Sequence, residues 1–412
     1  MLGIAAIAYF IAVSQRSSLG VATLVATERF HTNAQQLATL AVFQLVVYAA
    51  MQIPVGILLD RFGAKKLLAT GALIMAIGQL IVAFAPSLGF AVLGRMLVGM
   101  GDSFTFISMI RMVNGWYSGK KSTKLQQYIS SGGQLGQFFS AVPFWFMLEN
   151  IGWTTGFAIM SAASIVTLGL IIAFTSDDAH PEEVQVQAES LRHAVSQLVE
   201  NVRNPGIRMA FWTHFVTQPT TTSVALLWAV PFLVTAEGQS HDFAAFTLTS
   251  MVFFGFITGP LIGSWCAKRP QQRAAMVYFV VAATTLTWIL IVVQSAPIPA
   301  YLLYLAFLVI SIGGPASMIA FDFSKDIVSK SRLGTANGFA NVGGFLATFI
   351  MMYLTGLVID LNHLANGGTE RYTVESFRWG FSVQLLVVLV GIIFFAVERR
   401  RFLIESTAQS VE

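Results

Sequence analysis

Three ionisable residues interrupt otherwise apolar stretches in the first quarter of the chain. Arg16 lies in the middle of the first stretch, and Arg95 and Asp102 lie seven residues apart in the fourth. Seven residues are two helical turns, so Arg95 and Asp102 share one helix face. A buried arginine offers a planar fork of donors to a carboxylate or phosphate, and a buried carboxyl group can carry a proton. The pattern therefore predicts a site for an anion and a proton in an apolar medium.

A proton on Asp102 changes what its basic neighbours can do. Once neutral, the carboxyl group no longer compensates Arg16 and Arg95, which are then free to hold an anionic substrate. We therefore predict substrate binding by Arg16 and Arg95, and proton coupling by Asp102. The alternative is a static ion pair between Arg16 and Asp102 that joins two helices. Arg111, nearer the end of its stretch, is predicted to be structural.

The composition identifies the medium as a membrane. Of the 412 residues, 55% are hydrophobic and only 11% are charged, about half the charged share of a soluble globular protein. The apolar runs are continuous and about 20 residues long, which suits membrane helices and excludes a β-barrel. The single cysteine, Cys266, excludes an intramolecular disulfide and cysteine-rich metal sites. We predict no cofactor, metal or nucleic-acid partner, and no enzyme, because no nucleophile–base pair is visible.

Twelve apolar runs are long enough to cross a bilayer. The longest polar stretch, 176–207, separates them into two sets of six. The predicted fold is an all-α membrane protein with two six-helix bundles, residues 1–175 and 208–397, and a short tail, 398–412. The predicted spans are 2–25, 36–59, 66–86, 88–114, 125–148, 152–175, 208–235, 243–267, 274–295, 298–323, 334–360 and 377–397.

Lysine and arginine residues predict the orientation. Six groups of three basic residues follow every second span, whereas only three basic residues lie on the opposite side. The positive-inside rule then predicts a multi-pass protein of the cell (inner/plasma) membrane with both termini in the cytoplasm. Apolar residues recur at helical spacing over 191–202, so we expect an amphipathic helix in the linker, lying on the cytoplasmic membrane face.

A loop motif after the second span recurs 203 residues later. The later copy, from Gly259 to Arg269, keeps the first glycine and the Ala-basic-basic end but lacks an Asp-Arg pair. A weak repeat of this kind is typical of transporters with two related bundles. The first copy resembles the loop motif of the major facilitator superfamily, which implies alternating access. Its predicted gating residues are Gly56, Asp60, Arg61, Gly63 and Lys65.

Within that superfamily, the chain is similar to the anion:cation symporters, which move organic anions such as sugar acids with protons. The shared residues are Arg16, Tyr48, Arg95 and Asp102, whereas Gln15 stands where that group carries an acid. The resemblance implies that Tyr48 and polar amides bind substrate. The amide candidates are Gln134 and Gln137 in the fifth span, and Asn337 or Asn341 in the eleventh.

Other polar residues in the spans favour structural roles. Pro219 is expected to break the seventh span, and Gly313-Gly314-Pro315 is expected to be a flexible point in the tenth. His214 is expected to hydrogen-bond to a neighbouring helix, with titration near neutrality as the alternative. Beyond the tenth span, a second cytoplasmic charge cluster is predicted, formed by Asp322, Lys325, Asp326 and Arg332.

Two functions compete. The first is a secondary active transporter that works as a proton-coupled symporter of a small organic anion. The second is a proton-antiporting exporter of drugs or amphipathic metabolites, which usually carries a Gly-Pro pair that residues 131–143 lack. A non-transporting sensor would need a soluble signalling domain, and none is visible. The expected partners are a small-molecule substrate, protons and the lipid bilayer, and the protein is expected to be a monomer.

Overall fold

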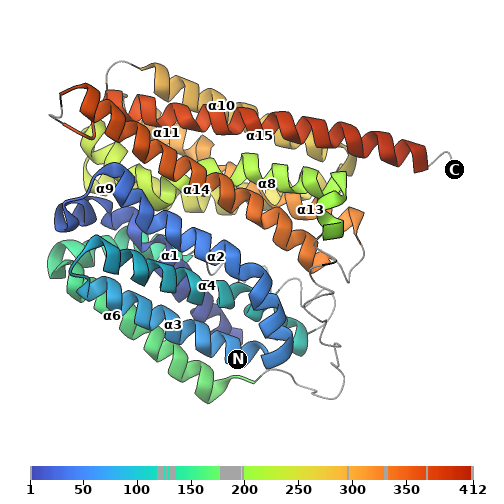
Figure 1. Ribbon diagram of the computed structural model, residues 1–412, viewed down its shortest axis with the longest axis horizontal. Helices are drawn as coiled ribbons and strands as arrows, with labels where there is room; N and C mark the ends of the chain where they lie inside the picture. The colour runs from blue at the N-terminus through green and yellow to red at the C-terminus, as the bar shows by residue number, and fades with distance from the viewer. Residues whose placement is uncertain are drawn as a thin grey trace. The chain divides into compact units, whose positions relative to one another are not determined.

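The chain folds into helices in all the parts that the computed structural model describes (Figure 1). The described residues are 2–117, 125, 129, 133, 135–176, 196, 199–294, 297–328, 333–367 and 370–409. The chain divides into two compact units, Met1–Glu189 and Ser190–Glu412. We call them the N-terminal and the C-terminal unit.

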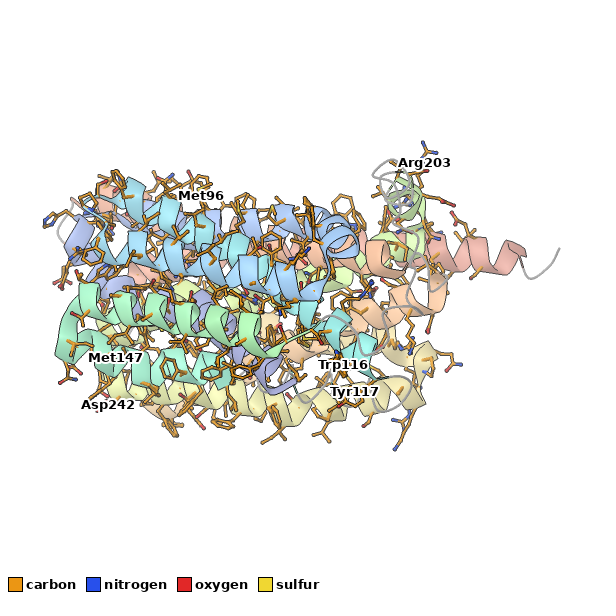
Figure 2. The ribbon with its side chains drawn as sticks, turned by 90° about the horizontal axis from the view of Figure 1, so that it is seen from below. Met96, Trp116, Tyr117, Met147, Arg203 and Asp242 are labelled. Atoms are coloured by element: carbon orange, nitrogen blue, oxygen red, sulfur yellow. The ribbon has the colours of Figure 1, made fainter. Side chains whose placement is uncertain are left out.

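The N-terminal unit consists of long apolar helices. The helix that begins at Leu88 ends at Trp116, and Tyr117 follows it in extended conformation (Figure 2). In order, the helices are α1 (Leu2–Phe30), α2 (Ala34–Phe62), α3 (Ala64–Phe84), α4 (Leu88–Trp116), the π-helical turn η1 (Ser140–Phe144) and α6 (Trp145–Phe174).

Local sequence signals place the ends of these helices. Asn33 begins α2 with a capping box, in which its side chain accepts the backbone N–H of Gln36 and the Gln36 side chain accepts that of Asn33. Gly63 joins α2 to α3 with φ 81°, and Gly152 interrupts α6 with φ 76°. Both φ values lie in the left-handed region that favours glycine, so each glycine marks a bend in the chain.

Glycine contacts bring α3 against α4. A Cβ built at Gly71 meets the carbonyl oxygen of Gly101 at 2.6 Å, and one built at Gly78 meets that of Gly94 at 2.7 Å. On its other side, α3 receives hydrogen bonds from α6, because Ser161 donates to the carbonyl of Ala76 at 2.7 Å. Small residues let the backbones approach closely, as is usual between membrane helices. This packing holds α4, and its ionisable residues, at a fixed depth.

The C-terminal unit contains shorter and more interrupted helices. Its first segment passes from α-helix into two π-helical stretches, and its fourth apolar segment is broken into three helices. In order, the helices are α8 (Pro205–Ser223), η2 (Val224–Trp228), η3 (Pro231–Ala236), α9 (His241–Lys268), η4 (Pro270–Gln272), α10 (Arg273–Val293), α11 (Ala300–Ser311), α12 (Gly313–Ala316), α13 (Ile319–Ile327), α14 (Leu333–Ala365) and α15 (Val374–Gln409).

The predicted break in the seventh span occurs with one correction. Pro219 lies within α8, and the break follows after Ser223, where the helix widens into η2. The glycine pair Gly313-Gly314 lies at the start of α12, where a Cβ at Gly313 would meet the carbonyl oxygen of Thr217 at 2.3 Å. The tenth span therefore bends where it touches α8, because only glycine fits there.

Ten segments in the described ranges are long and apolar enough to cross a membrane, compared with the twelve predicted. One difference is that the fifth and sixth predicted spans join in the single segment Leu135–Phe174. The other is that the seventh, 208–235, is not among the ten, because it is polar and broken by π-helical turns. The helix expected over 191–202 falls mostly outside the described residues, which show a helical stretch at 199–203.

Candidate functional site

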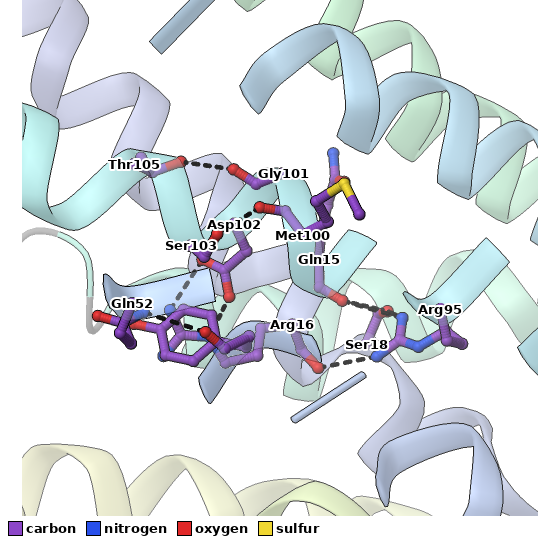
Figure 3. Close-up of polar contacts among 11 residues, drawn as sticks. Gln15, Arg16, Ser18, Gln52, Arg95, Met100, Gly101, Asp102, Ser103 and Thr105 are labelled. Carbon is purple, nitrogen blue, oxygen red and sulfur yellow. Dashed lines mark hydrogen bonds and ion pairs between the residues drawn. The ribbon is translucent and has the colours of Figure 1, made fainter. Parts of the chain in front are cut away.

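The ionisable residues of the first and fourth spans meet in the N-terminal unit. Arg16 on α1 donates to both carboxylate oxygens of Asp102 on α4, from Nε at 2.6 Å and from Nη2 at 2.8 Å (Figure 3). Such a bidentate pair is the strongest geometry that an arginine and a carboxylate adopt. The Asp102 side chain is 1% exposed and that of Arg16 is 17% exposed. The arginine is therefore the accessible member of the pair.

Tyr48 on α2 completes the surroundings of Arg16. The guanidinium carbon of Arg16 lies 4.9 Å from the centroid of the Tyr48 ring, which is a cation–π contact. One helical turn further, Gln52 donates its side-chain amide to the Tyr48 carbonyl at 3.3 Å. Tyr48 is buried. Arg16 thus lies between an aromatic face and a carboxylate, each contributed by a different helix.

Arg95 uses its donors on the backbone of α1. Its Nη1 donates to the carbonyl of Gln15 and to the Ser18 hydroxyl, both at 3.1 Å, and its Nη2 donates to the carbonyl of Arg16 at 3.0 Å (Figure 3). The side chain is 1% exposed. Arg95 and Asp102 both contact α1, as their shared helix face predicts. The contacts of Arg95, however, hold the backbone that carries Arg16.

Gln15 points to the opposite side of α1 and attaches it to α6. Its side-chain amide donates to the carbonyl of Met160 at 2.9 Å and to the hydroxyl of Ser164 at 2.5 Å. Gln15 is fully buried. The residue that stands in place of an acid therefore joins two helices and does not contact Asp102.

A close contact between α2 and α4 brings Tyr48 to this cluster. A Cβ at Gly99 would lie 2.2 Å from the carbonyl oxygen of Gln44. Gln44 lies one turn before Tyr48, and Gly99 lies one turn before Ser103. Any larger side chain at 99 would push the two helices apart. Gly99 thus sets the distance at which Tyr48 meets Arg16.

The amide candidates lie in different units or outside the described residues. Gln134 lies outside the described residues. Gln137 is half-buried, and its backbone carbonyl accepts the Ser140 hydroxyl at 2.8 Å. Asn341 lies half-buried on α14 of the C-terminal unit, and the Oδ1 atom of Asn337, one turn away, is buried without a partner among the described residues.

The predicted gating motif lies where α2 ends and α3 begins. Gly56, Asp60 and Arg61 are in the last turns of α2. The side chains of Asp60 and Arg61 are not among those that the structure describes. Gly63 provides the turn, and Lys65 donates to the carbonyl of Ile172 at 2.9 Å, close to the end of α6. A cation at a helix C-terminus is favoured by the helix dipole. Lys65 therefore fastens α3 to α6.

The C-terminal unit has a neutral polar interior beside α14. His214 on α8 is 2% exposed, and its ring lies 5.3 Å from that of Phe321. A Cβ at Gly344 would come within 2.0 Å of His214 Nδ1 and within 3.0 Å of Gln218 Oε1. The Nδ1 atom has no hydrogen-bond partner among the described residues, so the predicted interhelical bond from this nitrogen is not present there.

Charged contacts in the C-terminal unit lie near the ends of its helices. Asp326 of the predicted charge cluster pairs with Arg273 at the start of α10. Two further arginines, Arg208 and Arg401, pair with Glu398 at 2.8 and 3.0 Å. Sequence reasoning missed these pairs. Arg273–Asp326 and Arg208–Glu398 join residues far apart in the chain, whereas Arg401 lies one helical turn from Glu398. In the described ranges, no group of three or more His, Cys, Asp and Glu residues is placed to hold a metal ion.

The chain belongs to the Major Facilitator Superfamily, whose sequence profile matches residues 5–324. It is a multi-pass membrane protein of a transporter family, and members of this family are not enzymes. A solved structure of a bacterial homologue of the human lysosomal transporter Spinster has the same fold, with a TM-score of 0.78. It is 15% identical, and the match covers 98% of this chain and 97% of that one.

Named relatives transport organic anions. The chain is 25% identical over 380 residues to the probable sulfoacetate transporter SauU of Cupriavidus necator, and the match covers 87% of each chain. It is 21% identical over 374 residues to the hexuronate transporter of Bacillus subtilis, covering 84% of each. It is 22% identical over 358 residues to the probable galactarate/D-glucarate transporter GudP of Escherichia coli, covering 76% of this chain and 77% of that one.

Proposed function

We propose that the protein is a secondary active transporter that moves a small organic anion together with protons in the same direction. The observation that carries this proposal is the bidentate pair of Arg16 and Asp102, in which the arginine alone is accessible. A guanidinium fork held next to a carboxylate can exchange that carboxylate for the carboxylate or sulfonate of a substrate. The named relatives, which are anion transporters, support the same conclusion.

The coupling follows from the charge of the pair. With Asp102 ionised, its two oxygens occupy the Nε and Nη2 donors of Arg16. When Asp102 takes up a proton, the carboxyl group loses its charge and the salt bridge weakens, so the fork becomes available to the anion. When the proton leaves, the carboxylate again competes for the fork and displaces the anion. Substrate and proton are therefore bound together and released together.

The neighbouring residues have supporting roles in this proposal. Tyr48 binds the guanidinium face and sits where a substrate held by Arg16 is within reach. Arg95 acts as a positioning residue, since its three donor contacts hold α1 at 15–18 through two backbone carbonyls and the Ser18 hydroxyl. Gln137 and Asn341, together with Gln134, supply neutral hydrogen bonds to the rest of the substrate.

The architecture in this proposal is twelve spans in two six-helix bundles, 1–175 and 208–397, joined by the linker 176–207. Two observations support a count above ten. Gly152 bends the long segment Leu135–Phe174, and the segment Pro205–Ala236 is buried along most of its length although it is polar and broken. The protein is a monomer in the inner or plasma membrane, with both termini cytoplasmic. The Gly56–Lys65 motif controls alternating access.

Proteoliposomes that contain a pH dye test the proposal. Purified protein is challenged with sulfoacetate, D-glucuronate, galactarate, dicarboxylates and aromatic acids. Symport predicts acidification of the lumen on addition of one class of acid, and this signal must be absent from protein-free liposomes, because weak acids cross bilayers unaided. Silence with all acids, together with proton release on addition of cationic dyes, would instead identify a proton-antiporting exporter.

A further inference from the structure

Asp322 is a carboxylate that the proposed site does not use. It lies in the first turn of α13 and is half-buried. In the described part of the C-terminal unit, no hydrogen bond or ion pair to its carboxylate is present. Arg273 acts on it through space but bonds to Asp326, one turn further along α13. Among the described members of the predicted cluster, Asp326 is therefore paired and Asp322 is not, and Arg332 lies outside the described residues.

The Asp322 carboxylate borders a cavity. This cavity, of about 120 Å³, lies between α9 and the stretch from α12 to α13. Gly259 and Gly263 line it from α9, and Pro315 and Met318 line it from the other side. A Cβ built at Gly263 meets no atom within 4 Å, which is independent evidence of open space there. Apart from Asp322, the lining residues are apolar.

The internal repeat explains this arrangement. When Gly259 is aligned with Gly56, Gly263 occupies the position that Asp60 holds in the first copy. A glycine there removes one carboxylate from α9 and leaves room beside that helix. Asp322 borders the vacated space from α13. The second copy of the motif thus lacks an acid at this position in the sequence, and a carboxylate from α13 lies beside it.

The charged and titratable groups around Asp322 leave it accessible to a proton. The nearby groups are Cys266 on α9, Arg273 on α10, Lys325 and Asp326 on its own helix, and His214 on α8 next to Phe321. The part of α14 next to α13 carries no charged residue. An unpaired carboxylate among apolar side chains is costly, while the dipole of α13 partly compensates a negative charge in its first turn. Both the protonated and the ionised form of the Asp322 carboxyl group are therefore energetically accessible.

We propose that Asp322 takes up and releases a second proton in each transport cycle. The proposal rests on the proposed function, in which Asp102 carries the first proton. A proton fits this cavity better than a metal ion, since Ca²⁺ or Mg²⁺ requires six or more oxygen ligands and the walls offer one carboxylate. Because Gln15 cannot be ionised, the cluster around Arg16 contains one carboxylate, and Asp322 supplies the other from the C-terminal unit.

The second proton can be tested by the accumulation ratio, which is the internal over the external substrate concentration, at zero membrane potential. Each proton that moves down a gradient of one pH unit supports about tenfold accumulation. With labelled sulfoacetate, D-glucuronate and galactarate as probes, we expect about 100-fold accumulation for the wild type and about tenfold for Asp322→Asn. The matched control is Asp242→Asn, which removes an exposed carboxylate from the first turn of α9 (Figure 2) and should leave the ratio unchanged.

Carbodiimide labelling is a second test, which needs no substrate and complements the accumulation ratio. Dicyclohexylcarbodiimide reacts with protonated carboxyl groups in apolar surroundings, and mass spectrometry locates the adduct. We expect labelling of Asp322 that decreases as the pH rises, and no labelling of Asp242. Gly263→Leu fills the cavity while retaining Asp322. It should abolish the labelling and lower the accumulation ratio to about tenfold, whereas Gly263→Ala should change neither.

The outcomes separate the two proposals. An equal accumulation ratio in the wild type and in Asp322→Asn, or an Asp322 that carbodiimide does not label at any pH, would overturn the second proton while leaving symport intact. A wild type whose accumulation of all three probes ignores the pH gradient would overturn symport itself, and the second proton with it. If Asp322→Asn does not fold, the Gly263→Leu ratio decides in its place.

Discussion

The interiors of the two units differ in charge. In the N-terminal unit, Arg16, Arg95 and Asp102 meet in the middle of α1 and α4, and the arginines use five donor contacts on α1 and α4. In the described part of the C-terminal unit, the ion pairs lie near helix ends, and the interior beside α14 is lined by neutral polar groups such as His214 and Gln218. Two halves of one repeat have therefore diverged chemically.

This difference indicates a division of labour. Charge chemistry requires a carboxylate and a guanidinium held at a fixed distance, which the short glycine contacts of α4 provide. Neutral amides and hydroxyls recognise shape and hydroxyl patterns, which differ between one organic anion and another. We expect the N-terminal unit to bind the charged group of the substrate and the C-terminal unit to select the remainder. Changes in the N-terminal unit should then have the larger effects.

The largest effect is expected for Arg16→Ala. Removing one partner of a buried ion pair costs about 3–5 kcal/mol, and here it also removes the anion-binding fork. Substrate binding should weaken at least about 100-fold with folding retained. Isothermal titration with the transported anion measures the change, and Asn341→Ala in the C-terminal unit is the comparison, with a loss of about tenfold. Equal losses in the two variants would contradict the division of labour.

Asp102→Asn should separate binding from coupling. The amide cannot ionise, so the protein should bind substrate without a proton at this site. Exchange of external for internal substrate should persist. The part of the pH-driven accumulation that depends on the proton of Asp102 should disappear. Parallel counterflow and gradient-driven uptake assays measure the two activities. Normal proton-driven uptake in this variant would remove Asp102 from the mechanism.

Gly99→Ala tests how the N-terminal unit is held together. The new methyl group would lie 2.2 Å from the carbonyl oxygen of Gln44, so α2 and α4 must separate, at a cost of about 1–3 kcal/mol. Thermal unfolding in detergent should show a lower Tm and substrate affinity should fall, because Tyr48 moves away from Arg16. Gly263→Ala, which meets no atom within 4 Å, is the control in the C-terminal unit and should leave Tm unchanged.

The smallest effect concerns Glu237, beyond the end of the predicted span 208–235. Its buried carboxylate accepts the backbone N–H of Ile298 at 2.5 Å. Burial raises the pKa of Glu237 and the hydrogen bond lowers it, with burial dominant. The folded state therefore binds this proton more tightly than the unfolded state, and the stability that the proton contributes is lost as the pH rises through the folded pKa.

We expect the free energy of unfolding of the wild type to decline by less than about 1 kcal/mol as the pH rises from the unfolded pKa of Glu237 through its folded pKa. The Tm should fall with it. In Glu237→Gln this decline should be absent. Thermal unfolding at a series of pH values measures it. A decline of the same size in both proteins would assign the pH dependence to other groups.

Much of the fold could be predicted because membrane helices are recorded directly in the sequence as long apolar runs. Most predicted spans match a helix, and spacing alone put Arg95 and Asp102 on the face of α4 that meets α1. The predicted count of twelve spans and the ten segments found in the described ranges differ at places where length and hydropathy identify a span poorly. Gly152 turns the chain without a polar loop, and α8 is buried enough to tolerate many threonines.

The contacts of Arg95 could not be predicted. Its acceptors on α1 are mainly backbone carbonyls, which every residue has and which leave no trace in the sequence. Likewise, the pairing of Asp326 with Arg273 depends on how α10 and α13 pack, which the sequence does not show. Side-chain chemistry could be inferred from residue types, whereas the choice of partner depends on packing.

The π-helical turns η2 and η3 give the segment 205–236 a property that straight helices lack. Each π turn holds one residue more than the α-helix around it, because its hydrogen bonds run to the fifth residue instead of the fourth. One extra residue shifts the side chains that follow it by about 100° around the helix axis, compared with an uninterrupted α-helix. The two π turns therefore decide which side chains of the segment face inward beyond them.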